Sequence, residues 1–228
     1  MGQGFCSLDE FLTGRGRFAV GAPLKGQVAW LVAFLVVAGM AYGAVMGSFS
    51  ALAAGRQHQL LYSAAKVPML LLVTFLLCLP SFFVINAVTG LRDDFGEAVK
   101  AVVAAQACVA VALAGLAPFT VLFYLSSSDY TLAVFFNGVM FALATLAAQI
   151  VVRRYYGPLI QRSPRHRIMF LLWLALYIFV GIQMAWVLRP FVGDPNAPVA
   201  FFRADAWSNA YIVIVHLVAH FLKTISQF

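Results

Sequence analysis

In GMAYGAVMGSFSALAAG, residues 39–55, a small residue stands at every fourth position: Gly39, Gly43, Gly47, Ala51 and Gly55. Positions four apart share one face of an α-helix, so the row predicts a strip of nearly bare backbone along a helix. Helices in lipid gain no hydrophobic attraction for one another and associate through close backbone contact, which such rows permit. We therefore expect a partner helix to pack along these five residues.

The composition around this stretch is that of an integral membrane protein. Of the 228 residues, 63% are hydrophobic and only 10% are charged, whereas soluble domains average about 25% charged residues. Uncharged runs cover residues 26–55, 67–91, 101–128, 130–152 and 168–188. Each is near or above the roughly 20 residues that cross a bilayer core. The runs are continuously apolar, whereas barrel strands alternate, so we predict an all-α, polytopic transmembrane helix bundle with five spans over residues 26–189.

Polar groups inside the predicted spans are few. The amides of Asn86, Asn137 and Gln183 fall there, and such amides usually bond to a neighbouring helix, contributing about 1 kcal/mol. They could instead line one polar cavity together. No charged residue falls deep in a predicted span, which disfavours an ion-coupled transporter. Pro80 stands mid-span and predicts a kink.

The third run is rich in alanine from Ala101 to Ala117. Small residues on several faces allow close neighbours on several sides, so we expect this span to be central and to pack against the small-residue row of the first span.

Two predicted segments lie outside the spans: residues 1–25 precede them, and residues 190–206 join them to the C-terminal helix. Residues 1–25 carry Asp9 and Glu10 where a secretory signal would carry basic residues, so we expect a retained segment with a short interfacial helix. Residues 190–206 hold three prolines and form a predicted outer loop. The loop residues Phe191, Phe201 and Phe202 either enter the membrane interface or are covered by another chain.

Residues 207–228 predict an amphipathic C-terminal helix. Its polar residues Asn209, His216, His220, Lys223 and Gln227 fall on one narrow stripe surrounded by apolar residues. The favoured position is along the outer interface or docked on the bundle, and a sixth span is the alternative. His216 and His220 stand four apart, a spacing that can hold a metal ion or a haem. No metal or cofactor is otherwise expected.

The positive charges predict the orientation. With the N-terminus in the cytoplasm and the C-terminus outside, ten of the 15 Lys and Arg residues fall on the cytoplasmic side. The densest group is predicted to contact anionic lipid headgroups there: Arg153, Arg154, Arg162, Arg165 and Arg167. Nucleic acid is not an expected partner, because the basic residues lack the interleaved aromatic residues that stack on bases.

A short segment before the second apolar run reads Tyr62-Ser63-Ala64-Ala65-Lys66-Val67-Pro68. With the five-span, N-cytoplasmic layout of residues 30–190, it resembles bacterial members of the Yip1-like multispan membrane proteins. The resemblance implies a small, non-catalytic protein of a bacterial inner membrane that works through partners.

Two classes of function follow from these observations. The favoured one is a non-catalytic scaffold or accessory subunit that packs with other membrane subunits or with copies of itself. The chain shows no nucleophile–base pair, phosphate-binding loop or zinc signature, so it is not expected to be an enzyme. The alternative is a channel or facilitator for a small uncharged solute, which the Pro80 kink and the three amides would serve.

Overall fold

The computed structural model describes residues 2–19, 26–51, 56–194, 198–203 and 211–212. Within these ranges the chain is helical and forms no strand. The elements are α1 (Gly2–Thr13), η1 (Gly16–Phe18), α2 (Gln27–Ala51), α3 (His58–Val88), η2 (Arg92–Asp94), α4 (Phe95–Ser126), α5 (Tyr130–Arg162) and α6 (Arg165–Leu188). Helices α2 to α6 are long and apolar enough to cross a membrane, which confirms the prediction of an all-helical membrane protein with five candidate spans. The predicted C-terminal helix lies outside the described residues.

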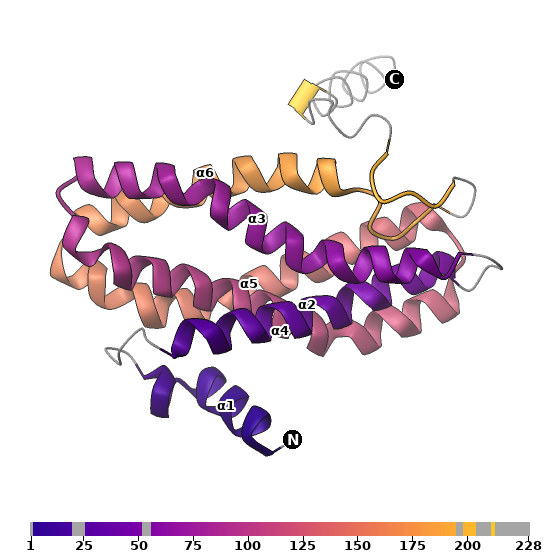
Figure 1. Cartoon of the computed structure of the whole chain (residues 1–228), viewed down its shortest axis with the longest axis horizontal. Helices are drawn as coiled ribbons and strands as arrows, with labels where there is room; N and C mark the ends of the chain where they lie inside the picture. The colour runs from indigo at the N-terminus through magenta and orange to yellow at the C-terminus, as the bar shows by residue number, and fades with distance from the viewer. Residues whose placement is uncertain (1, 20–25, 52–55, 195–197, 204–210, 213–228) are drawn as a thin grey trace, which may run out of the picture.

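The five long helices run along the long axis of the molecule (Figure 1). We call the end that holds α1, the α3–α4 turn and the α5–α6 turn the α1 end. The opposite end, which holds the α4–α5 turn and residues 189–194, is the loop end. Helix α2 packs against α3 and α4, α4 also packs against α5, and α6 packs mainly against α3. The Ala-rich α4 is therefore a central helix, with Ala101, Ala104 and Ala107 buried.

The helices extend beyond the uncharged runs that predict them. Helix α3 begins at His58, so Lys66 and Pro68 lie inside it rather than at its start. Helix α4 continues through Pro118 to Ser126, and α5 continues through charged residues to Arg162. An uncharged run ends at the first ionic side chain, but the helix itself continues until a cap or a turn. The helix can continue because its ends lie in water, where charged side chains are tolerated.

The small-residue row of α2 faces α3. A Cβ built at Gly43 would lie 2.9 Å from the Ala64 Cα, and one at Gly47 would lie 2.8 Å from the Leu60 Cα. At Gly39 the nearest atoms belong to Pro68, at 3.4 Å.

The expectation that the third span fills this row is therefore wrong. The second span fills it, and α4 packs on another side of α2. The short connection between α2 and α3 makes them an antiparallel hairpin, which brings the nearest helix in sequence onto the row. Ala51 is half-buried at the end of α2, and Gly55 lies outside the described residues.

The N-terminal helix α1 docks at the α1 end. Phe11 and Phe18 are buried, and both rings contact Phe34 of α2. The Arg154 guanidinium donates to the Leu12 carbonyl at 3.0 Å, and the Tyr155 hydroxyl donates to the Phe18 carbonyl. These contacts tie residues 11–18 to α2 and to the last turns of α5.

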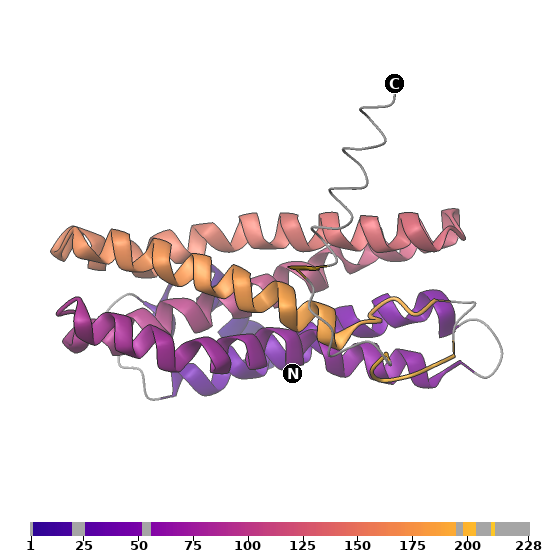
Figure 2. The ribbon, with the colours of Figure 1, turned by 90° about the horizontal axis from the view of Figure 1, so that it is seen from above.

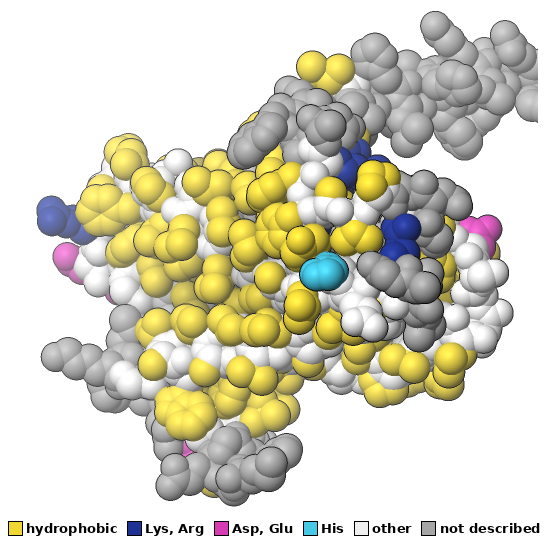
Figure 3. Space-filling view, turned by 45° about the vertical axis from the view of Figure 1, so that its right-hand side comes forward, with side chains coloured by type: hydrophobic (Ala, Val, Ile, Leu, Met, Phe, Trp, Pro, Cys, Tyr) yellow, Lys and Arg dark blue, Asp and Glu magenta, His cyan; other side chains and the backbone are white. Residues whose placement is uncertain are grey.

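The surface of the bundle is apolar between its two ends. Figure 3 shows hydrophobic side chains over most of the visible face, with Lys and Arg side chains gathered toward the ends. Large apolar residues on the long helices are well exposed, including Val88, Leu125 and Phe135. A surface of this kind is compatible with lipid and would be an aggregation hazard in water.

Candidate functional site

The least buried of the five long helices is α6. Figure 2 shows α6 starting beside the end of α5 and slanting away from it toward the loop end. The two helices have few contacts with each other, although a two-residue turn joins them. Two cavities are lined by residues of both helices, and we call this region the α5–α6 seam.

The seam contains two adjoining cavities. The loop-end cavity, of about 490 Å³, has Tyr130, Asn137, Gly138, Arg189 and Arg203 in its lining. The mid-span cavity, of about 440 Å³, is lined mainly by apolar and aromatic side chains of α3, α4, α5 and α6. Leu70, Phe141 and Ala185 line both, so the two cavities adjoin each other along the seam. Each volume lies within the range of about 300–1,000 Å³ that is typical of small-molecule sites.

The mid-span cavity combines aromatic walls with two buried polar groups. Phe170, Trp173 and Tyr177 of α6 supply rings, and Trp173 is only 6% exposed. Thr74 and Gln106 also line this cavity, and neither Thr74 Oγ1 nor Gln106 Nε2 has a hydrogen-bond partner among the described residues. An unpaired buried polar group costs about 1–3 kcal/mol.

A buried lysine closes the loop end. The Lys66 side chain of α3 is fully buried, donates to the Pro190 carbonyl at 2.8 Å and lies 4.9 Å from the centre of the Phe201 ring. The Ser63 hydroxyl donates to the Phe191 carbonyl. A buried ammonium is costly unless it is hydrogen-bonded, so these partners offset its desolvation.

Lys66 and its neighbours bear on two sequence expectations. Lys66 lies inside a candidate span, near its start and next to the uncharged run 67–91, so the expectation that no charge lies deep in a span is not contradicted. Phe201 is covered by this chain itself, through Lys66 and an edge-on contact with the Tyr62 ring at 5.3 Å. Phe191 is half-buried beside the same helix, and Phe202 is exposed.

The next residues of the loop fit against the hairpin of α2 and α3. Gly193 has a φ of +75°, a conformation that glycine adopts without strain. A Cβ at this position would lie 2.7 Å from the Gln59 Cγ. The loop is thus held by residues of α3 from Gln59 to Lys66, and it places Arg189 at the mouth of the seam.

Two arginines line the loop-end cavity. The Arg189 guanidinium carbon lies 3.2 Å from the centre of the Trp186 ring, and Arg203 donates to the Tyr130 hydroxyl at 3.4 Å. None of the described residues that line either cavity is acidic. The described charged residues at the mouth of the seam are thus basic, and the described lining of its interior is mainly apolar.

The three predicted amides do not gather around one cavity. Asn137 lines the loop-end cavity and accepts from the Tyr42 hydroxyl at 2.9 Å, while its amide nitrogen donates to the Tyr124 hydroxyl at 2.6 Å. These bonds join α2, α4 and α5 next to the loop-end cavity. Asn86 is buried at the α1 end, and Gln183 is half-buried outside the lining of both cavities.

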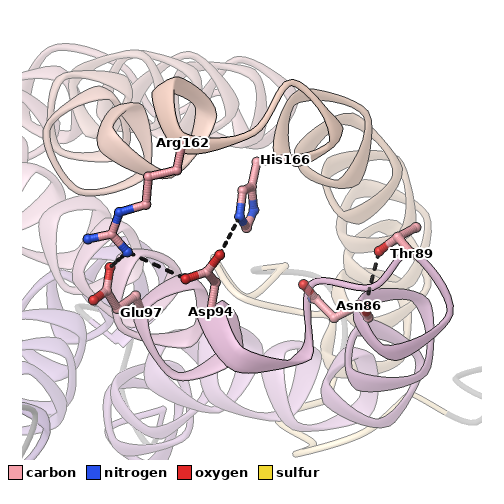
Figure 4. A network of polar contacts seen from close by, with 6 residues as sticks. All are labelled: Asn86, Thr89, Asp94, Glu97, Arg162 and His166. Carbon is pink, nitrogen blue, oxygen red and sulfur yellow. Dashed lines mark hydrogen bonds and ion pairs between the residues drawn. The ribbon is translucent and has the colours of Figure 1, made fainter.

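The α1 end of the seam is closed by a polar cluster (Figure 4). His166, at the start of α6, is fully buried, and its Nε2 lies 2.9 Å from Asp94 Oδ2. Arg162, at the end of α5, contacts Asp94 at 3.4 Å and Glu97 at 3.2 Å. Asn86 donates to the Phe82 carbonyl at 3.1 Å on the neighbouring helix end. The cluster ties the α5–α6 turn to the start of α4.

The five arginines predicted to contact lipid have different roles in the structure. Arg154 binds α1 and Arg162 binds the acidic residues of the polar cluster. Arg153, Arg165 and Arg167 are exposed at the α1 end and remain available to headgroups.

The predicted metal ligands His216 and His220 lie outside the described residues. Within the described ranges, no group of three or more His, Cys, Asp or Glu side chains could hold a metal ion. Comparison with protein-family models, with curated proteins and with solved structures finds no match for this chain.

Proposed function

We propose that this chain is a non-catalytic accessory protein of a membrane assembly, and that it acts by holding a second membrane component in the α5–α6 seam. The observation that carries this proposal is the pair of adjoining cavities between α5 and α6. Few contacts join these two helices, yet both ends of the seam are built: the loop held by Lys66 at one end and the His166–Asp94 pair at the other. A seam braced at both ends is suited to hold a molecule along its length.

The small-residue row no longer argues for an external partner. Its backbone strip is occupied by α3 of the same chain, so it stabilises the fold rather than an assembly. The proposed binding surface is instead the seam, where residues of α3 such as Leu70 and Thr74 line the cavities together with α5 and α6. In the proposed orientation the N-terminus is cytoplasmic, the loop end faces outward, and Arg153, Arg165 and Arg167 meet anionic headgroups of the inner leaflet.

The polar groups of the seam support binding rather than catalysis. Asn137 is committed to two tyrosine hydroxyls, and Lys66 is committed to a backbone carbonyl. Neither is poised as a base beside a nucleophile, which an activated nucleophile requires. The described residues that line the cavities offer mainly ring faces and alkyl surface, with a few hydroxyl and amide groups and two guanidinium groups.

A facilitator for a small uncharged solute finds less support. A conducting path needs polar groups along its length, but Asn137 and Asn86 lie at opposite ends of the bundle. The cavities also adjoin the exposed α6, so they face the side of the bundle rather than its axis.

The test uses glycine substitutions with matched surroundings. A Cβ built at Gly138, in the lining of the loop-end cavity, or at Gly115, on α4 outside both linings, would meet no described atom within 4 Å. Gly138→Phe should fill the seam, whereas Gly115→Phe should place the same ring on the bundle surface.

The wild-type protein and the two variants would be purified in mild detergent and analysed by native mass spectrometry for bound lipids and polypeptides. We expect a bound component on the wild type and on Gly115→Phe that Gly138→Phe has lost. The same bound species on all three proteins, or on none, would contradict the proposal. Vesicle permeability that Gly138→Phe abolishes would favour the facilitator instead.

A further inference from the structure

We propose that the occupant of the α5–α6 seam is a membrane lipid with an anionic headgroup, bound with its head at Arg189 and Arg203 and one hydrocarbon chain running toward Trp173. This inference rests on the proposed function and names the class of molecule that the seam holds.

The charge distribution selects the headgroup. Arg189 and Arg203 are both half-exposed and line the loop-end cavity, and Lys66 adds a third positive charge behind Phe201. No acidic residue is among the described residues of the cavity lining. Guanidinium groups form paired hydrogen bonds with phosphate or carboxylate oxygens, so an anionic head matches this mouth better than a neutral one.

The apolar interior selects a flexible chain. Beyond Leu70, Phe141 and Ala185 the lining is mainly alkyl and aromatic, with no charged side chain among its described residues. It includes four uncharged polar residues: Thr74, Gln106, Thr145 and Gln149. Burial of a CH₂ group makes the free energy of binding more favourable only when the group leaves water, and a lipid chain in a bilayer is already surrounded by hydrocarbon. Selectivity in the seam therefore comes from the arginines, while the chain determines the depth that the ligand reaches.

A partner helix fits the seam less well than a lipid chain. The two cavities are separate volumes of about 490 and 440 Å³ joined at three shared residues. A helix with side chains is about 10–12 Å across, and it binds most closely where small residues line its partner. Here the lining residues that the two cavities share include the large side chains of Leu70 and Phe141.

Trp173 provides a reporter inside the seam. It is 6% exposed, so the lipids around the outside of the bundle have little access to it, whereas a chain in the mid-span cavity would touch it. A variant that retains only this tryptophan, with Trp30, Trp186 and Trp207 replaced by Phe, would be reconstituted in phosphatidylcholine vesicles. Increasing fractions of phosphatidylglycerol or phosphatidylcholine with brominated chains would then be added. Bromine quenches the fluorescence of a tryptophan that it contacts.

We expect the anionic brominated lipid to reach half-maximal quenching of Trp173 at about a tenfold lower mole fraction than the zwitterionic one. Arg189→Gln with Arg203→Gln should remove this preference, and Gly138→Phe should remove the tight component of quenching. Phe119 is 58% exposed on α4, so the tryptophan of Phe119→Trp reports the surrounding lipid. Its quenching should show little preference between the two brominated lipids.

The outcomes separate the two proposals. Equal quenching by both lipids that Gly138→Phe still reduces would overturn the anionic selectivity but keep a lipid-binding seam. Absence of Trp173 quenching, with a bound polypeptide that Gly138→Phe releases, would overturn the lipid and keep the accessory function. No quenching together with no bound component would overturn both. Should the double arginine variant fail to fold, the comparison of the two lipids on the single-tryptophan protein still decides the question.

Discussion

The contact between α2 and α3 makes a sharp prediction about two glycines one helical turn apart. Gly43→Ala would place a methyl group 2.9 Å from the Ala64 Cα and closer still to the Ser63 carbonyl oxygen. Gly39→Ala would place the same methyl group 3.4 Å from the ring of Pro68, an ordinary van der Waals distance. Both substitutions add the same side chain to the same helix, so their difference isolates the fit against α3.

The expected magnitudes follow from these distances. Alanine is favoured over glycine in a helix by about 1 kcal/mol, so Gly39→Ala should raise the free energy of unfolding by up to about that amount. At Gly43 the neighbouring atoms belong to the backbone and cannot rotate away, so α3 must move by at least the 0.5 Å between 2.9 and 3.4 Å. Overpacking of this kind costs about 1–3 kcal/mol. We therefore expect Gly43→Ala to lower the stability by up to about 2 kcal/mol relative to the wild type.

The assay is reversible unfolding in mixed micelles of a mild detergent and dodecyl sulfate, followed by circular dichroism. The unfolding free energies should not depend on protein concentration, because the row packs within one chain. Equal stability of the two variants would refute the assignment of the row to α3, and so would a loss at Gly43 that appears only on dilution.

Three further predictions concern buried polar groups. Lys66→Met should speed amide hydrogen exchange in residues 191–194 by about tenfold or more, because it removes a charge-assisted hydrogen bond to the Pro190 carbonyl that is worth about 1.5–3 kcal/mol. Unchanged exchange would show that Lys66 does not hold the loop. Asn137→Leu should lower stability by about 1–3 kcal/mol, because it removes the partner of the Tyr124 hydroxyl and leaves the Tyr42 hydroxyl only a 3.4 Å contact with Thr120 Oγ1. Gln149→Leu on the same helix should change the stability by less, and similar values for the two variants by dodecyl sulfate titration would argue against the network. Thr74→Val should raise the thermal midpoint of the delipidated protein, because it replaces an unpartnered hydroxyl with a methyl group; a lower midpoint would indicate that Thr74 has a partner.

The five helices could be predicted from sequence because long apolar runs report helix length directly. The ends of the helices could not, because the runs stop at charged residues that the helices accommodate. Lys66 illustrates the difficulty. It borders an apolar run, where a lysine usually extends to water, but in the structure it donates to the Pro190 carbonyl, 124 positions away. No local pattern links those two residues.

The need of the small-residue row for a close partner was visible in the sequence, but the identity of the partner was not. Both α3 and α4 present small residues, and the short connection to α3 decides between them. The seam was also invisible, because it depends on the direction in which α6 leaves α5. His166 and Asp94 close that seam across 72 positions, and neither residue stands in a recognisable motif.

The most direct test of the account asks whether hydrocarbon reaches the interior of the seam. A membrane-soluble diazirine would be photolysed in vesicles that contain the wild-type protein, and the labelled residues would be mapped by mass spectrometry. We expect the diazirine to label Trp173, despite its 6% exposure, as well as Phe119, which is 58% exposed. The Trp173 label should be strongly reduced in Gly138→Phe. Labelling of Phe119 without any label on Trp173 would contradict an accessible α5–α6 seam.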